Sequence, residues 1–221
     1  MSTHNTINPS LSGSQSVSIN KVLKNTYMLL GMTLVFSAIT AAVSVFVGIS
    51  QMMALGSMIA AFVMLFVVHK TADSSKGLLA IFVFTGLMGL SLGPMLSRYL
   101  ALESGPQLVM QALGGTGIIF FALSGYALVS KKDFSFLGGF LMVGLLVVIV
   151  AAIANIFFAV PAVSLALSSA IIFIMSGLIL FDTSRIIHGG ETNYIRATVS
   201  LYLNIYNIFV HLLSILGVMD D

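Results

Sequence analysis

The chain has 221 residues, of which 58% are hydrophobic and 7% are charged, and its formal net charge is +2. Soluble domains carry about 25% charged residues, so this composition excludes a soluble globular protein and indicates an integral membrane protein. The positive charge is small and dispersed, with no run of Lys or Arg that could follow a phosphate backbone, which excludes nucleic-acid binding. The sequence has no Cys, which excludes disulfides, thiolate metal ligands and Cys nucleophiles.

Residues 1–20 are rich in Ser, Asn and Thr and contain no apolar run. Such a segment is typical of neither a signal peptide nor a packed element. We expect it to form a flexible cytoplasmic tail, and residues 21–221 to form one transmembrane domain.

Charged residues divide the rest of the chain into uncharged apolar runs. A transmembrane helix needs about 20 residues, and two of these runs are long enough for two helices each. The first long run has a break at Gly48–Gln51, and the second has one at Pro161. The sequence therefore predicts an all-α integral membrane protein with seven transmembrane helices. They are expected at Tyr27–Val47, Met52–Val68, Leu78–Ser97, Gln107–Val129, Phe134–Val160, Ala162–Phe181 and Ala197–Val218.

The positively charged side chains fall almost entirely on one side of these seven spans. Only Arg98 lies on the other side. Because Lys and Arg concentrate in cytoplasmic loops, the N-terminus is predicted to be cytoplasmic and the C-terminus to lie outside. The residues on the predicted cytoplasmic side are Lys21, Lys24, Lys70, Lys76, Lys131, Lys132, Arg185 and Arg196.

The last predicted helix carries a stripe of polar residues at Ser200, Asn204, Asn207, His211 and Ser214. Steps of three and four residues return to the same side of a helix, so these five side chains share one face. A polar face cannot point into lipid without a large cost, so it is expected to face other helices or a wet cavity. Two readings follow: hydrogen bonds that hold a central helix in place, or a polar path for protons or cations.

Asp182 is an acidic residue directly at the end of an apolar run. One reading is an interfacial carboxylate that pairs with Arg185, one helical turn later. The other reading places the carboxylate inside the bundle, where acids usually mark ion or proton paths. The sequence is compatible with both.

Gly89 to Gly93 matches the G-x-S-x-G pattern of serine hydrolases. That motif works on a turn between a strand and a helix, whereas here it lies inside an apolar span. An intramembrane protease would instead need Ser91 to meet His211, which is the only such pair the sequence offers. The His and acidic residues lack metal-ligand spacing, so no metal site is expected.

Several short segments of the predicted helices and junctions carry a recognisable pattern. They are Gly93-Pro94 with Tyr99 beyond it, Lys131-Lys132-Asp133-Phe134-Ser135-Phe136-Leu137, Asn155-Ile156-Phe157, Leu201-Tyr202-Leu203-Asn204 and Asn207-Ile208-Phe209. Together they resemble the Bax inhibitor-1 family of seven-span membrane proteins, and the resemblance extends over nearly the whole chain from Lys21. The stretch from Ile186 to Tyr202 is similar to the bacterial YccA-like branch, whose members modulate the membrane protease FtsH.

The resemblance implies a fold in which six helices surround a central seventh helix. It also implies a location in the bacterial inner membrane, with the C-terminus in the periplasm. The implied function is binding to FtsH, a membrane-bound ATP-dependent protease, and inhibition of its degradation of membrane proteins. FtsH and the lipid bilayer are the expected partners, and neither an enzymatic activity nor a cofactor is expected.

A branch of the family that leaks calcium suggests an alternative function. In that branch, an acid at the cytoplasmic end of the sixth span pairs with a second acid on the seventh span and forms a pH-sensitive latch. Asp182 matches the first position, and Asn204 stands where the second acid is expected. The alternative is therefore a pH-sensitive calcium or cation leak through the bundle near Asp182. The hypothetical ion path or gate consists of Asp182, Arg185, Asn204, Asn207 and His211.

Overall fold

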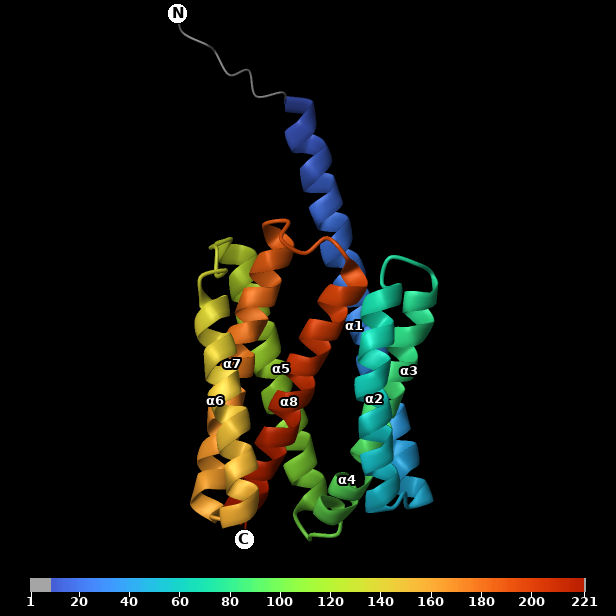
Figure 1. The fold of residues 1–221 in the computed structure, drawn as a ribbon, viewed down its shortest axis with the longest axis vertical. Coiled ribbons are helices and arrows are strands. Elements are labelled where there is room, and N and C mark those ends of the chain that lie inside the picture. Colours follow the sequence, from blue (N-terminus) through green and yellow to red (C-terminus); the bar gives the residue numbers. More distant parts are fainter. Residues whose placement is uncertain (1–8, 221) are drawn as a thin grey trace, which may run out of the picture.

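The computed structural model describes residues 9–220, and side chains from residue 17 onward. This part of the chain forms eight helices (Figure 1). They are α1 (Pro9–Val47), α2 (Gln51–Thr71), α3 (Lys76–Ser91), α4 (Gly93–Leu100), α5 (Gly105–Ser130), α6 (Leu137–Phe158), α7 (Pro161–Ile187) and α8 (Tyr194–Asp220).

Within the described residues, seven helical segments are long and apolar enough to cross a membrane, which confirms the predicted fold class. The short helix α4 continues α3 after a break, and together they form the third segment, Lys76–Leu100. Pro94 lies in the first turn of α4, where its missing N–H costs no helical hydrogen bond. Most helices extend a few residues beyond their predicted spans.

Two helix ends differ from the prediction in ways that matter for function. Helix α1 begins at Pro9, inside the predicted tail, so the described part of that tail is helical; residues 1–8 lie outside the described residues. Helix α7 continues past Phe181, the predicted end of the sixth span, to Ile187. Asp182 therefore lies within a helix rather than at its end.

The breaks between paired helices follow from local backbone chemistry. Gly48 ends α1 with φ 71°, a left-handed conformation that glycine adopts without a Cβ clash. Ser50 then caps α2, because its side chain accepts a hydrogen bond from the Met53 backbone N–H at 3.3 Å. At the second break, Pro161 occupies the first turn of α7. Both breaks predicted from the sequence are confirmed.

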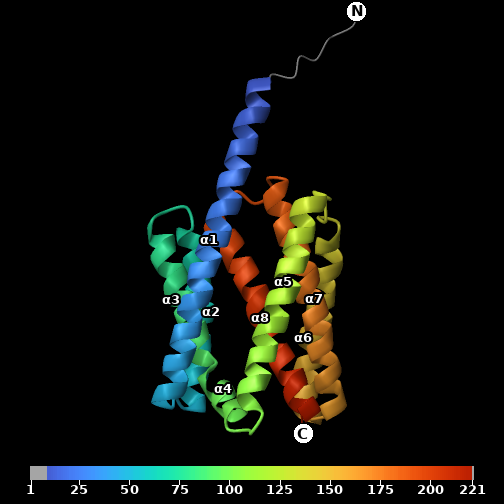
Figure 2. The ribbon, with the colours of Figure 1, turned by 180° about the vertical axis from the view of Figure 1, so that it is seen from behind.

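Helix α8 is inclined through the middle of the bundle, between a group formed by α1, α2 and α3 and a group formed by α5, α6 and α7 (Figures 1 and 2). It packs mainly against α7, α5 and α1, with smaller contacts to α2 and α3. The central position of the last helix is thus confirmed. Helix α6 lies at the outside of the bundle and packs on α7.

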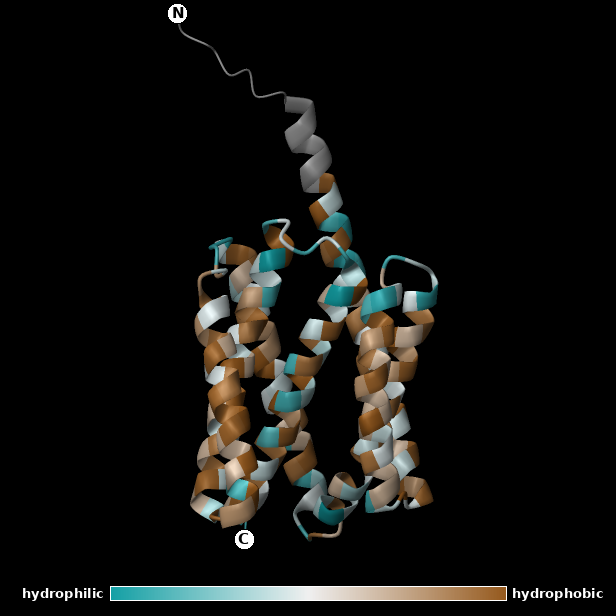
Figure 3. Cartoon of the chain, in the orientation of Figure 1, coloured by the Kyte–Doolittle hydropathy of each residue, from teal (hydrophilic) through white to brown (hydrophobic). Residues whose placement is uncertain are grey.

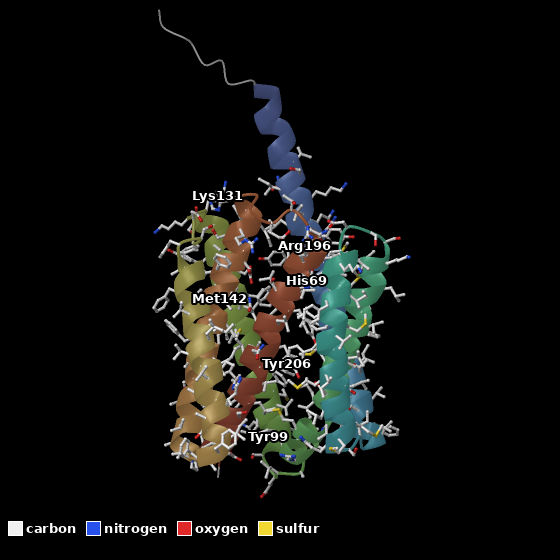
Figure 4. All side chains as sticks on the ribbon, viewed as in Figure 1. His69, Tyr99, Lys131, Met142, Arg196 and Tyr206 are labelled. Atoms are coloured by element: carbon white, nitrogen blue, oxygen red, sulfur yellow. The ribbon has the colours of Figure 1, made fainter. Side chains whose placement is uncertain are left out.

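The surface chemistry matches a membrane environment. Figure 3 shows hydrophobic residues over the middle of the bundle and hydrophilic residues at its two ends. Hydrophilic residues also appear within the apolar zone along α8. Lys131 and Arg196 lie at the same end of the bundle as the N-terminal extension of α1, and Tyr99 lies at the other end (Figure 4). Lys131 and Arg196 therefore lie at one end of the bundle, as the predicted separation of positive charges implies, and the side of the membrane that this end faces stays a prediction.

Candidate functional site

The centre of the candidate site is a hydrogen bond between the last two helices. Asn204 of α8 is buried, with 4% of its surface exposed, and its Nδ2 donates to Oδ2 of Asp182 on α7 at 2.8 Å. Asp182 itself is partly buried. A carboxylate that accepts a hydrogen bond from an amide is far less costly in a bundle than an unpaired one. The two residues that the family pattern placed together do meet in space.

Arg185 does not pair with Asp182, contrary to one of the two readings of the sequence. Its guanidinium donates to the Gly190 carbonyl at 3.1 Å and lies 3.9 Å from the Glu191 carboxylate. The same group lies over the ring of Phe181, 5.5 Å from the centroid. Arg185 thus contacts the loop after α7, and Asn204 partners Asp182 instead.

A second link between α7 and α8 lies farther along the polar stripe. Nδ1 of His211 is 3.1 Å from Oγ of Ser168 on α7. Asn207 donates to the Leu203 carbonyl of its own helix, and Ser214 does the same to Val210 at 3.0 Å. Two members of the stripe thus bridge helices and two bond within α8, while the fifth, Ser200, is partly buried. This pattern supports the reading in which hydrogen bonds hold a central helix; the ion path stays a prediction.

The opposite face of α8 carries a second set of hydrogen bonds that sequence analysis missed. The Tyr202 hydroxyl donates to the Thr85 carbonyl at 3.4 Å and lies 2.7 Å from Oγ of Ser37. The Tyr206 hydroxyl lies 3.1 Å from Oγ of Ser91. These bonds join α8 to α1 and α3. The sequence carries this signal in two Tyr four residues apart, which share a helix face, but a Tyr side chain is mostly apolar and does not stand out among hydrophobic neighbours.

The hypothetical serine protease pair does not form. Ser91 bonds to Tyr206 and to the Met88 carbonyl at 2.7 Å, whereas His211 bonds to Ser168. A nucleophile and its base must lie within hydrogen-bond reach of each other. Across the described residues, no cluster of three His, Asp or Glu side chains could hold a metal ion.

The loops at the basic end form a polar network around the start of α8. Arg196 lies 3.4 Å from Asp73 in the turn between α2 and α3, and 3.7 Å from Glu191 in the loop before α8. Glu191 in turn accepts a hydrogen bond from the Asn193 backbone N–H at 2.9 Å. This network ties the central helix to both of its neighbouring loops.

Comparisons with known proteins cover nearly the whole chain. A family described as "Inhibitor of apoptosis-promoting Bax1" matches residues 19–221. An uncharacterized membrane protein of Vibrio cholerae is 55% identical over 208 residues, which are 94% of this chain and 93% of that protein. The modulator of FtsH protease YccA of Escherichia coli is 52% identical over 201 residues, which are 91% of each chain. A protein from another Escherichia coli strain, named inner membrane protein YccA, shows the same identity and coverage.

The apolar spans and the hydrogen-bonded central helix define an all-α integral membrane protein. The family match over residues 19–221 includes nearly all of the seven spans, and the relatives are similar over 91% or more of this chain. The chain belongs to the Bax inhibitor family, as the resemblance predicted.

Proposed function

We propose that this protein resides in the bacterial inner membrane, binds FtsH and slows its degradation of membrane proteins. The observation that carries the proposal is the 52% identity, over 91% of both chains, to a protein named modulator of FtsH protease. Identity at this level over 91% of both chains supports a shared role.

The N-terminal part of α1 offers a surface for a cytoplasmic partner. It extends beyond the bundle at the end that carries Lys131 and Arg196 (Figures 1 and 4). Val17 is 68% exposed there, and Lys21 and Lys24 are exposed as well. By the positive-inside rule this end is cytoplasmic, so the extension is directed toward the compartment in which a soluble protease domain would work.

The interior of the bundle supports resistance to extraction. The links from α8 to Asp182, Ser168, Ser37 and Thr85 connect the central helix to both surrounding groups of helices. Pulling one helix out of such a bundle would expose several polar groups to hydrocarbon at once. A bundle of this kind can occupy a processive protease without being degraded quickly.

The test combines co-purification with a lifetime measurement in the same cells. Overproduction of the protein should lengthen the lifetime of a known membrane substrate of FtsH several-fold, and FtsH should co-purify with it. Asn204→Leu should weaken the bundle and lengthen the substrate lifetime less than the parent does. Asn207→Leu should act like the parent, because among the described residues Asn207 bonds to Leu203 of its own helix. An unchanged substrate lifetime at high protein level, without co-purification, would overturn the proposal.

A calcium or cation leak is a second candidate, favoured by the Asp182 carboxylate inside the α7–α8 contact and by His211 farther along the same face. Purified protein in liposomes should then pass calcium at some pH between about 5 and 8, the range in which His titrates. Asp182→Asn should abolish this flux. Calcium flux no greater than that of empty liposomes at every pH would rule out the leak as a function and leave FtsH modulation as the remaining candidate.

A further inference from the structure

A cavity of about 820 Å³ lies between α1 and α5, and α8 forms its floor. Helix α1 lines it from Tyr27 to Phe46, and α5 lines it from Val109 to Phe121. Figure 2 shows α1 and α5 standing apart, with α8 behind them. The lining is almost entirely apolar, so the cavity is chemically distinct from the polar contact between α7 and α8.

Both ends of this cavity are closed by protein. At the basic end, the Tyr27 hydroxyl of α1 bonds to Ser124 of α5, and its ring packs 6.0 Å from that of Phe120. At the opposite end, α4 packs against both α1 and α5, and its Leu96 and Leu100 line the cavity. The cavity therefore opens sideways, toward the hydrocarbon of the bilayer.

The side chains at this opening are those of a lipid-facing surface. Phe46 on α1 is 93% exposed and Phe121 on α5 is 72% exposed. Deeper in the cavity, Phe209 of α8 is only 8% exposed. An apolar cavity of this kind stays free of water, so what fills it must come from the membrane.

We propose that one acyl chain of a membrane phospholipid enters through this opening and lies against α8. The volume falls within the range of about 300–1,000 Å³ in which proteins bury small ligands. At 1.5 Å per residue, the lined part of α1 from Tyr27 to Phe46 is about 28 Å long, and that of α5 from Val109 to Phe121 is about 18 Å long. One leaflet fills half of a core that is about 30 Å thick, so a single acyl chain fits within the stretch that both helices line.

A transmembrane helix of a partner fits the cavity less well. A helix with its side chains is about 10 Å across and would need a furrow open along the whole membrane. The Tyr27–Ser124 contact and α4 block both ends of such a furrow. A flexible acyl chain enters from the middle of the bilayer, where its free end lies, and its headgroup remains outside.

The proposal can be tested by fluorescence, because the chain has no Trp. In nanodiscs of phospholipid with brominated acyl chains, the emission of Phe209→Trp should be quenched nearly as strongly as that of Phe173→Trp, which sits at a lipid-facing position 70% exposed. Adding Gly117→Leu should narrow the cavity from the α5 wall and reduce the quenching of the floor reporter. Gly114→Leu is the matched control and should leave the quenching unchanged.

The two glycine substitutions lie on the same helix, and a Cβ causes no steric clash at either position; they differ in whether the residue lines the cavity. A Cβ on either Gly117 or Gly114 would meet no atom within 4 Å, but only Gly117 lines the cavity. If Phe209→Trp fails to fold, Phe120→Trp on the α5 wall carries the same test. An unquenched reporter, or quenching that Gly117→Leu does not reduce, overturns the proposal. A reporter that is shielded by a second copy or by a partner helix would also remain unquenched and overturn it.

Discussion

Asn193, just before α8, donates a hydrogen bond of 2.7 Å to the Asp73 carboxylate in the turn between α2 and α3. The same amide group donates to the Ala72 carbonyl at 2.9 Å. Its Oδ1 accepts hydrogen bonds from the backbone N–H groups of Ile195 and Arg196, at 2.9 and 3.1 Å. One side chain therefore caps the central helix and fastens it to the α2–α3 pair.

Replacing Asn193 by Ala should destabilise the protein by about 1–2 kcal/mol, because the cap of α8 and the tie to Asp73 are lost together. Asn193→Ser should cost less, since Ser retains an acceptor for the cap but is too short to reach the turn. Unfolding in mixed micelles with increasing denaturing detergent would measure the loss of stability in both variants. Equal stability of the Ala variant and the parent would show that the cap is unimportant.

The bond between Asn204 and Asp182 should appear as an energetic coupling between the two residues. Hydrogen bonds between membrane helices average about 0.6 kcal/mol in double-mutant cycles, and this is the coupling we expect from substituting each residue by Leu, singly and together. Asn207 paired with Asp182 in the same cycle should give a coupling near zero, because Asn207 bonds to Leu203. Equal couplings for the two pairs would contradict the assigned geometry.

The two Tyr residues of α8 should differ in their response to loss of the hydroxyl group. Tyr202→Phe leaves Ser37 without its described partner in a fully buried site and should cost about 1 kcal/mol. Tyr206→Phe should cost less, because Ser91 still donates to the Met88 carbonyl. The same unfolding measurement compares the stability of the two variants. A larger loss of stability for Tyr206→Phe than for Tyr202→Phe would contradict this prediction.

The packing of α1 on α3 depends on glycine at position 89. A Cβ there would collide with the Ser37 carbonyl and with the Thr40 side chain, so Gly89→Ala should destabilise by about 1–3 kcal/mol. Gly114→Ala, where the added Cβ meets nothing, should instead stabilise by up to about 1 kcal/mol through helix propensity. If both substitutions shift stability in the same direction, close α1–α3 packing is not the reason for the glycine.

The orientation prediction can be tested by labelling, since the chain has no Cys. Ser75→Cys in the turn between α2 and α3 should be protected from a membrane-impermeant maleimide in intact spheroplasts. Glu103→Cys, in the turn between α4 and α5, should react readily. The reverse pattern would place the N-terminus outside.

The sequence predicted the spans well because membrane insertion depends on local composition. The seven apolar segments, the break at Gly48 and the break at Pro161 could all be identified from neighbouring residues. The start of α1 at Pro9 and the end of α7 at Ile187 were missed, since helices can continue into polar sequence beyond the bilayer. Local pattern therefore identifies what crosses the membrane but not where each helix stops.

The polar stripe of α8 separates what the sequence alone can predict from what depends on the tertiary structure. By itself the sequence determined that this face must avoid lipid, because hydrocarbon offers no hydrogen-bond partners. Only the tertiary structure decided that Asn204 meets Asp182, that Arg185 turns to Glu191, and that Tyr202 bonds to the opposite side. Partners on different helices depend on the rotation and inclination of each helix, which packing over the whole bundle sets. The cavity between α1 and α5 likewise depends on packing over the whole bundle. No local sequence pattern predicts the distance between two helices that are far apart in the chain.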